Sequence, residues 1–116
     1  MRHRKKGVIL GRKIGARRAL IKNLAASLVL YEKVKTTEAK AKAIRPYVER
    51  LVTVAKNPSL ANRRLLLKKL PTEGPVKKLI EVLGPRYHTR RGGYLRLTKL
   101  GLRQGDRGRS AMIEFV

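Results

Sequence analysis

The sequence contains no cysteine and no tryptophan, and its 116 residues include one phenylalanine and four tyrosines. The absence of cysteine excludes disulfide bonds and metal sites that use thiolate ligands. The two histidines, His3 and His88, are far apart in the sequence, so no metal site is expected from them either. Because aromatic residues are scarce, the core must be aliphatic, and a hydrophobic content of 42% is enough for one domain of this length.

Long apolar runs are absent as well. The only apolar run in the basic N-terminal segment is Val8–Leu10. A signal peptide needs an apolar run of about 7–15 residues, and a transmembrane helix needs about 20. We therefore expect a cytosolic protein that makes no use of a membrane.

Acidic residues are scarce: 7 Asp and Glu stand against 30 Lys and Arg, which gives a formal net charge of +23. The few acids are scattered, and the sequence has neither a Ser-His-Asp set nor a glycine-rich phosphate-binding loop. We therefore expect no enzyme activity, no cofactor and no small-molecule substrate. A charge of this size indicates a polyanionic partner, and nucleic acid is the first candidate.

The basic charge is most concentrated in the first eighteen residues, which contain eight Lys or Arg and no acid. Like charges repel and little apolar area is available there, so the segment cannot fold alone. We expect residues 1–15 to form an extended basic tail that becomes ordered on a polyanion, and residues 16–116 to form the globular domain. The alternative is a solvated arm without a binding role.

Hydrophobic periodicity predicts the order helix, strand, three helices and two strands. The predicted helices cover 16–31, 38–56, 58–70 and 73–84, and the predicted strands cover 32–36, 94–99 and 110–116. The helix over 38–56 has one apolar stripe, formed by Ala41, Ile44, Val48, Leu51, Val52 and Ala55, and the last strand has one apolar face, formed by Ala111, Ile113 and Phe115. Pro46 predicts a kink there or a break at Arg45, and Gly84-Pro85 predicts the end of the fourth helix. In the strand over 94–99, Leu95 and Leu97 are predicted on one face, and Tyr94, Arg96 and Thr98 on the opposite, polar face. The fold class is a two-layer α+β domain with a small three-stranded sheet, plus the basic tail.

A second basic block follows the fourth helix and consists mostly of arginine. Its members are Arg86, Arg90, Arg91, Arg96, Lys99, Arg103, Arg107 and Arg109. Guanidinium groups bind phosphates in a bidentate manner, and Gly92-Gly93 allows the backbone to approach a ligand. Tyr87 and His88 could stack on an unpaired base, although a tyrosine after a helix more often covers the edge of a core. The alternative for the whole block is a solvated loop surface.

The candidate nucleic-acid-binding residues come from the tail, the first and third helices, and this block. They are Arg2, His3, Arg4, Lys5, Lys6, Arg12, Lys13, Arg17, Arg18, Arg63, Arg64, Arg86, Arg90, Arg91, Arg96, Arg103 and Arg107.

Three other interpretations remain open. A helix-turn-helix could occupy residues 58–84, with Lys77 and Lys78 facing DNA, although its second helix has few polar side chains to read bases. A DNA-architectural protein would need a dimer interface and apolar wedges. A membrane-active cationic protein would need one helix with a wide apolar face, whereas here the apolar residues are spread over four helices.

Several motifs in order along the chain resemble one known family. They are Met1–Gly7, Gly11-Arg12, Arg17–Leu20, Thr36-Thr37, Ala39–Lys42, Asn62–Arg64, Gly84–Tyr87, Arg91–Arg96, Gly105-Asp106 and Ala111–Glu114. Together they resemble the bacterial large-subunit ribosomal protein family number seventeen. The chain departs from the family pattern at Val8-Ile9, at Ala16 and at Leu30-Tyr31.

The resemblance implies a structural component of the large (50S) ribosomal subunit, located in the cytoplasm. It implies binding to 23S ribosomal RNA on the solvent side near the polypeptide exit, beside neighbouring large-subunit ribosomal proteins. It also implies the fold order given above, no enzyme activity and no cofactor.

Overall fold

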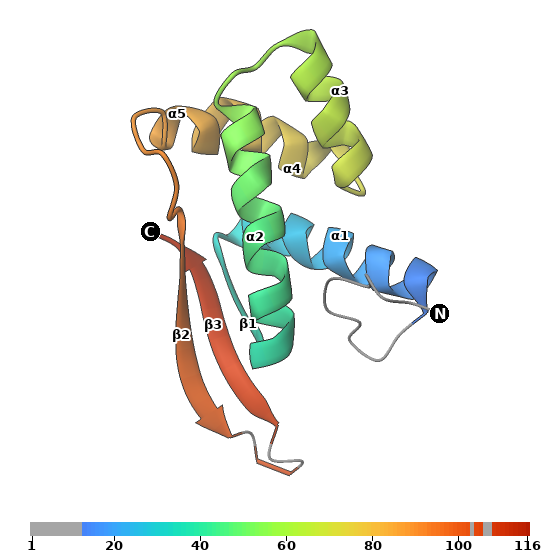
Figure 1. Ribbon diagram of the computed structural model, residues 1–116, viewed down its shortest axis with the longest axis vertical. Helices are drawn as coiled ribbons and strands as arrows, with labels where there is room; N and C mark the ends of the chain where they lie inside the picture. Colours follow the sequence, from blue (N-terminus) through green and yellow to red (C-terminus); the bar gives the residue numbers. More distant parts are fainter. Residues whose placement is uncertain (1–12, 103, 106–107) are drawn as a thin grey trace, which may run out of the picture.

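The computed structural model describes residues 13–102, 104–105 and 108–116, and Figure 1 shows how their elements are arranged. In chain order the elements are α1 (Ile14–Tyr31), β1 (Lys33–Thr37), α2 (Glu38–Ala55), α3 (Leu60–Lys69), α4 (Glu73–Lys78), the π-helical turn η1 (Leu79–Leu83), α5 (Gly84–Arg86), β2 (Leu95–Leu102) and β3 (Arg109–Phe115). The predicted α+β fold and its element order are confirmed. Most of the predicted tail lies outside the described residues, and α1 begins two residues earlier than predicted.

The three strands form one antiparallel sheet in the order β1-β3-β2. Ile113 on β3 is paired with Val34 on β1 and with Leu97 on β2, so these side chains share one face of the sheet. All three belong to the hydrophobic core or pack against it, on the side that α2 covers. The opposite face carries exposed cations, among them Lys35 and Arg96.

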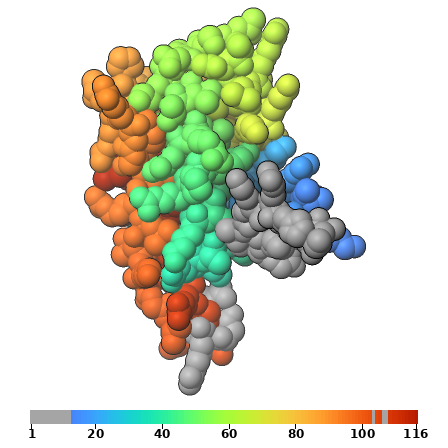
Figure 2. Space-filling model, viewed as in Figure 1, coloured from blue at the N-terminus to red at the C-terminus, as the bar shows by residue number. Residues whose placement is uncertain are grey.

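Helix α2 packs against all three strands and against α1, α3, η1 and α5. Its buried residues are Ala41, Ile44, Val48, Leu51, Val52 and Ala55, which is the predicted apolar stripe. In the space-filling view α2 runs along the middle of the molecule, between β2 and the side of α1 and α3 (Figure 2). The helix begins after Thr37, whose hydroxyl accepts a hydrogen bond from the Lys40 amide at 3.3 Å.

The predicted break at Arg45 is wrong, because α2 continues through Pro46. Proline lacks an amide hydrogen and leaves the carbonyl of Lys42, one turn earlier, without its helical donor. Lys42 and Pro46 are both exposed, so water can hydrogen-bond to that carbonyl. The helix tolerates the proline because it lies on the side that faces away from the core. The alternative of a kink stays a prediction.

The predicted helix end at Gly84-Pro85 is also wrong. Helix α4 passes into η1 and then into α5, and Gly84 is itself helical, with φ −54° and ψ −55°. Because Pro85 lacks an amide hydrogen and its ring crowds the preceding turn, a wider π turn is favoured, in which the Gly84 amide donates to the Leu79 carbonyl. A Cβ at Gly84 would lie 2.7 Å from the carbonyl oxygen of Ala55. This glycine therefore permits the close approach of α2.

Strand β2 is longer than predicted, because it extends to Leu102 beyond a bulge between Lys99 and Gly101. Gly101 has a φ of +96°, which glycine adopts without steric cost. Tyr94 precedes the strand and is fully buried, so its predicted position on the polar face is wrong. The strand alternation does not apply to Tyr94, since it lies in the loop that leads into β2.

The carboxylate of Glu32 connects the end of α1 to α4 and α5 through ion pairs with Lys78 and Arg86. Glu32 has a φ of +64°, which ends α1, and its amide donates to the Leu28 carbonyl at 2.8 Å. Both terminal nitrogens of Arg86 donate to the Glu32 carboxylate, and the Lys78 ammonium lies 3.0 Å from its Oε2 atom. Hydrogen bonds from Arg86 and Lys78 lower the pKa of Glu32 from 4.5 to about 2.

The role of Gly84 in the packing of α2 can be tested by comparison with Gly74, which has free space around it. Gly84→Ala places a Cβ against the Ala55 carbonyl, so we expect the free energy of unfolding to fall by about 1–3 kcal/mol. Gly74→Ala, in α4, meets nothing within 4 Å and is expected to be neutral or to stabilise by about 0.5–1 kcal/mol. Denaturant unfolding of both variants measures the difference, and equal effects would contradict the proposed role of Gly84.

The Glu32 contacts predict a pH dependence of stability. The Glu32 side chain is 36% exposed, so water screens the ion pairs, and we expect Glu32→Gln to cost about 1 kcal/mol at pH 7. Because the pKa of Glu32 is lowered in the folded state, this contribution is complete above pH 4.5 and is lost as the pH falls towards 2. Urea unfolding between pH 2 and 7 should show that the free energies of unfolding of the parent protein and of Glu32→Gln become equal near pH 2. Glu81→Gln, at an exposed glutamate, is the control and should show no such convergence.

Candidate RNA interface

The predicted binding residues fall into two groups. Those that the structure describes are Lys13, Arg17, Arg18, Arg63, Arg64, Arg86, Arg90, Arg91 and Arg96. The others, Arg2, His3, Arg4, Lys5, Lys6, Arg12, Arg103 and Arg107, lie outside the described residues and stay predictions. Apart from Arg17, which is half-buried, the described members are exposed, as a phosphate-binding role requires.

Arg90 and Arg91 are exposed on the loop between α5 and β2, and the backbone of this loop is anchored to the core. The carbonyl oxygen of Arg90 accepts hydrogen bonds from the Lys56 ammonium and from the Tyr94 hydroxyl, the latter at 3.2 Å. Lys56 also donates to the Tyr94 hydroxyl at 3.1 Å and lies 5.5 Å from the centre of its ring. The carbonyl of Arg90 is thereby held in place, and the side chains of Arg90 and of its neighbour Arg91 are presented to solvent.

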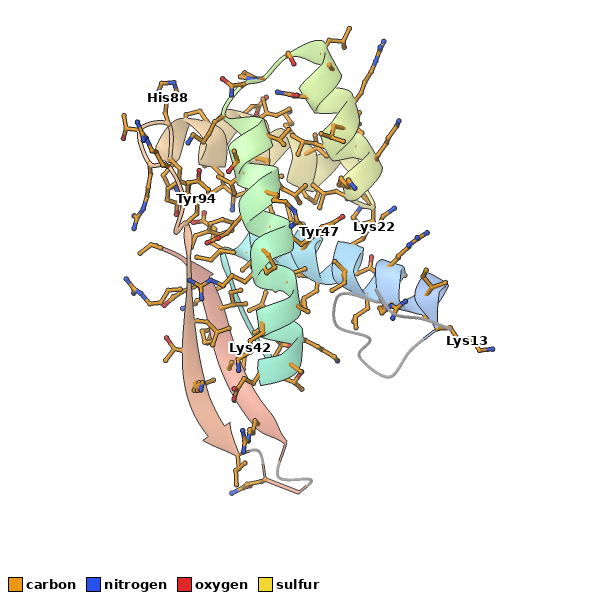
Figure 3. The ribbon with its side chains drawn as sticks, in the orientation of Figure 1. Lys13, Lys22, Lys42, Tyr47, His88 and Tyr94 are labelled. Carbon is orange, nitrogen blue, oxygen red and sulfur yellow. The ribbon has the colours of Figure 1, made fainter. Side chains whose placement is uncertain are left out.

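The sequence predicted that Tyr87 either stacks on a base or covers the edge of the core. In the structure Tyr87 covers the edge of the core. It is 3% exposed, and its hydroxyl donates to the Val116 carbonyl at 2.6 Å. Its ring packs 5.2 Å from that of Tyr94 and 6.1 Å from that of Phe115. His88 is exposed at the outer edge of the loop, whereas Tyr94 lies against α2 (Figure 3).

Two of the predicted arginines already have acidic partners within the fold. The guanidinium of Arg86 is held by Glu32, which raises the pKa of Arg86 further above its usual value. Arg96, on the open face of the sheet, lies 3.9 Å from the Glu114 carboxylate, and its side chain is 60% exposed. Arg86 thus has a structural role that the sequence did not reveal, because Glu32 is 54 residues away along the chain. Arg96 remains accessible to a ligand.

The third helix presents its predicted arginines at the surface. Arg63 lines a hollow of about 440 Å³ together with Glu73, Gly74 and Lys77, and Arg64 is exposed beside it. The helix-turn-helix interpretation of this region loses support here. Lys78 donates to the Leu30 carbonyl at 2.8 Å and pairs with Glu32, so it faces α1 rather than a DNA groove.

The structure also places two of the predicted arginines beside three lysines that were not predicted to bind. Arg17 and Arg18 on α1 line a groove of about 590 Å³ with Lys22, Lys68 and Lys69. Lys22 lies one helical turn after Arg18, a spacing that the sequence already contains. The meeting of α1 with the last turn of α3 is tertiary, so no local pattern could have revealed this groove.

The described residues contain neither a cluster of metal-ligating side chains nor a helix that could cross a membrane. Among residues 13–102, 104–105 and 108–116, no three His, Asp or Glu side chains gather where they could hold a metal ion. None of the helices in these ranges combines the length and the apolar character needed to cross a membrane.

Comparison with known proteins identifies the family of this chain. A family model described as ribosomal protein L17 matches residues 20–116, which span most of α1 and every later element. The chain is 49% identical over 116 residues to Large ribosomal subunit protein bL17 of Sphingopyxis alaskensis (strain DSM 13593 / LMG 18877 / RB2256), an alignment that covers 100% of this chain and 84% of the relative. The resemblance found in the sequence is confirmed: the chain belongs to the ribosomal protein L17 family and is a structural protein of the ribosome, not an enzyme.

Proposed function

We propose that this protein is a component of the large (50S) ribosomal subunit that binds and stabilises folded 23S ribosomal RNA. Its similarity to a relative named as a large-subunit protein supports the subunit, and the net charge of +23 supports an RNA partner. As a ribosomal protein it works in the cytoplasm. The role requires neither a cofactor nor a small-molecule substrate.

The observation that carries the proposal is the anchored position of Arg90 and Arg91. Fixing a backbone residue costs about 1–2 kcal/mol of conformational entropy, and a loop already held by Lys56 and Tyr94 avoids much of this cost on binding. The guanidinium groups then bind phosphate oxygens in a bidentate manner or stack on bases. The loop therefore serves as a preorganised contact for RNA that is itself folded.

Charge neutralisation supplies most of the affinity in this mechanism. The basic tail, with Lys13, Arg17 and Arg18 at the start of α1, follows the phosphates and reduces the repulsion between neighbouring RNA segments. If about ten phosphates are neutralised, the logarithm of the binding constant should fall against the logarithm of the salt concentration with a slope of about −7 to −9. Binding through this mechanism is steeply salt-dependent.

Neighbouring large-subunit proteins are the other expected partners. Leu30 and Tyr31, at the end of α1, are 42% and 73% exposed and form an adjacent apolar pair at the surface. Such a pair suits a contact with protein better than a contact with phosphate.

Replacing Arg91 by lysine tests whether the loop makes a specific contact. Arg91→Lys keeps the charge but removes the bidentate geometry, so we expect a loss of about 1–2 kcal/mol in affinity for a large-subunit RNA fragment. The salt slope should change little, because the number of positive charges is unchanged. Affinity titrations of both proteins across a salt series provide the measurement.

The matched control is Arg45→Lys, at an exposed arginine of α2 that lies 4.0 Å from Glu49. This substitution should leave RNA affinity unchanged at every salt concentration. If Arg91→Lys binds like the parent protein as well, the loop makes only diffuse electrostatic contact and the proposed specific role of Arg91 is wrong.

A further inference from the structure

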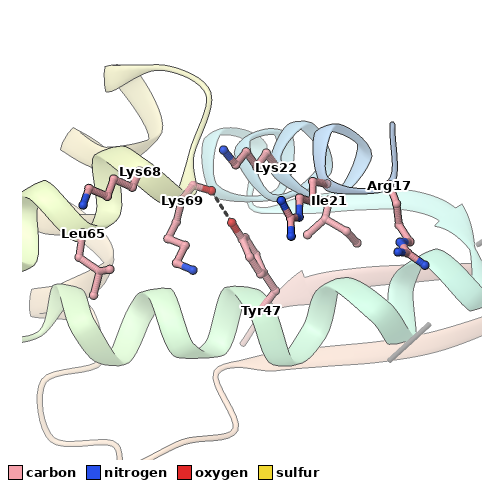
Figure 4. A pocket seen from close by; sticks show the side chains of 8 residues that line it. Arg17, Ile21, Lys22, Tyr47, Leu65, Lys68 and Lys69 are labelled. Atoms are coloured by element: carbon pink, nitrogen blue, oxygen red, sulfur yellow. Dashed lines mark hydrogen bonds between the residues drawn. The ribbon is translucent and has the colours of Figure 1, made fainter. Parts of the chain in front are cut away.

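The groove between α1 and α3 combines a basic rim with an apolar floor. Ile21 from α1, Tyr47 from α2 and Leu65 from α3 line it (Figure 4). Ile21 packs against the core, whereas Leu65 is 40% exposed within the groove. A second hollow of about 250 Å³ adjoins it and shares Tyr47, Leu65 and Lys69. The floor therefore offers apolar contact area that phosphate binding alone does not need.

The rim of the groove is entirely cationic. Arg17, Arg18 and Lys22 come from α1, and Lys68 and Lys69 come from the last turn of α3. None of these side chains takes part in an ion pair with the described acids, and none of those acids lines the groove. Five cations around one hollow repel each other, and an anion bound there relieves that repulsion.

The ring of Tyr47 has a fixed orientation in the groove. Its hydroxyl donates to the Lys69 carbonyl at the end of α3, as the dashed line in Figure 4 shows. Burial raises the pKa of Tyr47, so the phenol stays neutral and keeps this hydrogen bond at physiological pH. The ring thus forms part of the apolar floor, with its polar group already hydrogen-bonded.

We propose that this groove binds an unpaired nucleotide of RNA. The base packs against Ile21, Tyr47 and Leu65, while the flanking phosphates contact the cations of the rim. The combination of an apolar and aromatic floor with a basic rim is the arrangement by which proteins bind single-stranded nucleic acid. A duplex hides its bases and would use only the rim. The inference rests on the proposed RNA-binding function and adds the class of RNA segment that this groove takes.

Two leucines on α3 provide a matched pair of variants. Leu65 is 40% exposed and lines the groove, whereas Leu67 is 38% exposed and does not. In the full-length protein, Leu65→Gln should weaken binding of a ten-nucleotide single-stranded RNA roughly fivefold to tenfold, on the scale of one base contact. Leu67→Gln should bind like the parent protein, and neither variant should change binding of a duplex of the same sequence. Thermal unfolding of both variants checks that the fold is retained.

Charge variants test the rim separately from the floor. Lys22→Gln combined with Lys68→Gln should make the salt slope for single-stranded RNA shallower by about 1.4, if each lysine contacts one phosphate. Lys33→Gln combined with Lys35→Gln removes the same charge from β1, whose residues do not line the groove, and should change the slope less. Crosslinking with an RNA that carries 4-thiouridine at its centre, followed by mass spectrometry, should identify peptides that contain Tyr47 or Leu65.

The outcomes separate this inference from the proposed function. Equal binding by Leu65→Gln and Leu67→Gln, or crosslinks confined to other surfaces, would show that the groove does not hold a base. Competition by poly-glutamate as effective as by RNA would show that the groove takes an acidic protein segment instead. In either case the Arg91→Lys effect can still be observed, and only a failure of the parent protein to bind any RNA would overturn the proposed function itself.

Discussion

The burial of one apolar stripe on α2 is the interaction on which the rest of the structure depends. Ile44, Val48 and Val52 are fully buried, with the sheet on one side and α1, α3 and η1 on the others. At roughly 1.5–3 kcal/mol for each buried aliphatic side chain, this stripe makes a large contribution to stability in a chain that lacks tryptophan and cysteine. Because one central helix gathers the apolar contacts, the Lys and Arg side chains are left at the outside of the fold.

The few acids are used where elements meet. Glu32 binds Arg86 and Lys78 at the junction of α1 with the later helices. Glu38 opens α2 beside Lys42 and Lys99, which lower its pKa, Lys42 more strongly than Lys99. These carboxylates neutralise cations at structural positions, and among the described residues no acid forms an ion pair with the cations of the α1–α3 groove or with Arg90 and Arg91. The charge imbalance of the sequence therefore becomes a division between structural ion pairs and cations available to RNA.

Features that depend on local periodicity could be predicted from the sequence, and features that depend on tertiary approach could not. The apolar stripe of α2 follows from a spacing of three to four residues, and the core-facing side of β3 follows from a spacing of two residues. Both were predicted correctly. Gly84 has the local pattern of a helix end, but its role is set by the nearby Ala55 carbonyl. Arg86 has the pattern of a binding residue, but a distant glutamate holds it. The α1–α3 groove was missed for the same reason, since its rim comes from two helices separated in sequence.

Helix α2 also sets the distance between the two surfaces that we assign to RNA. Tyr47 lies in the middle of α2 and forms the floor of the groove, while Lys56 caps its end and holds the loop that carries Arg90 and Arg91. At 1.5 Å per residue these two positions are about 13 Å apart along the helix axis. Because the same buried stripe fixes both positions, the groove and the loop cannot move independently while α2 stays packed. Under the proposed function, an RNA that contacts both surfaces must present its phosphates and its unpaired base at this separation, so the packing of α2 restricts which RNA segments fit.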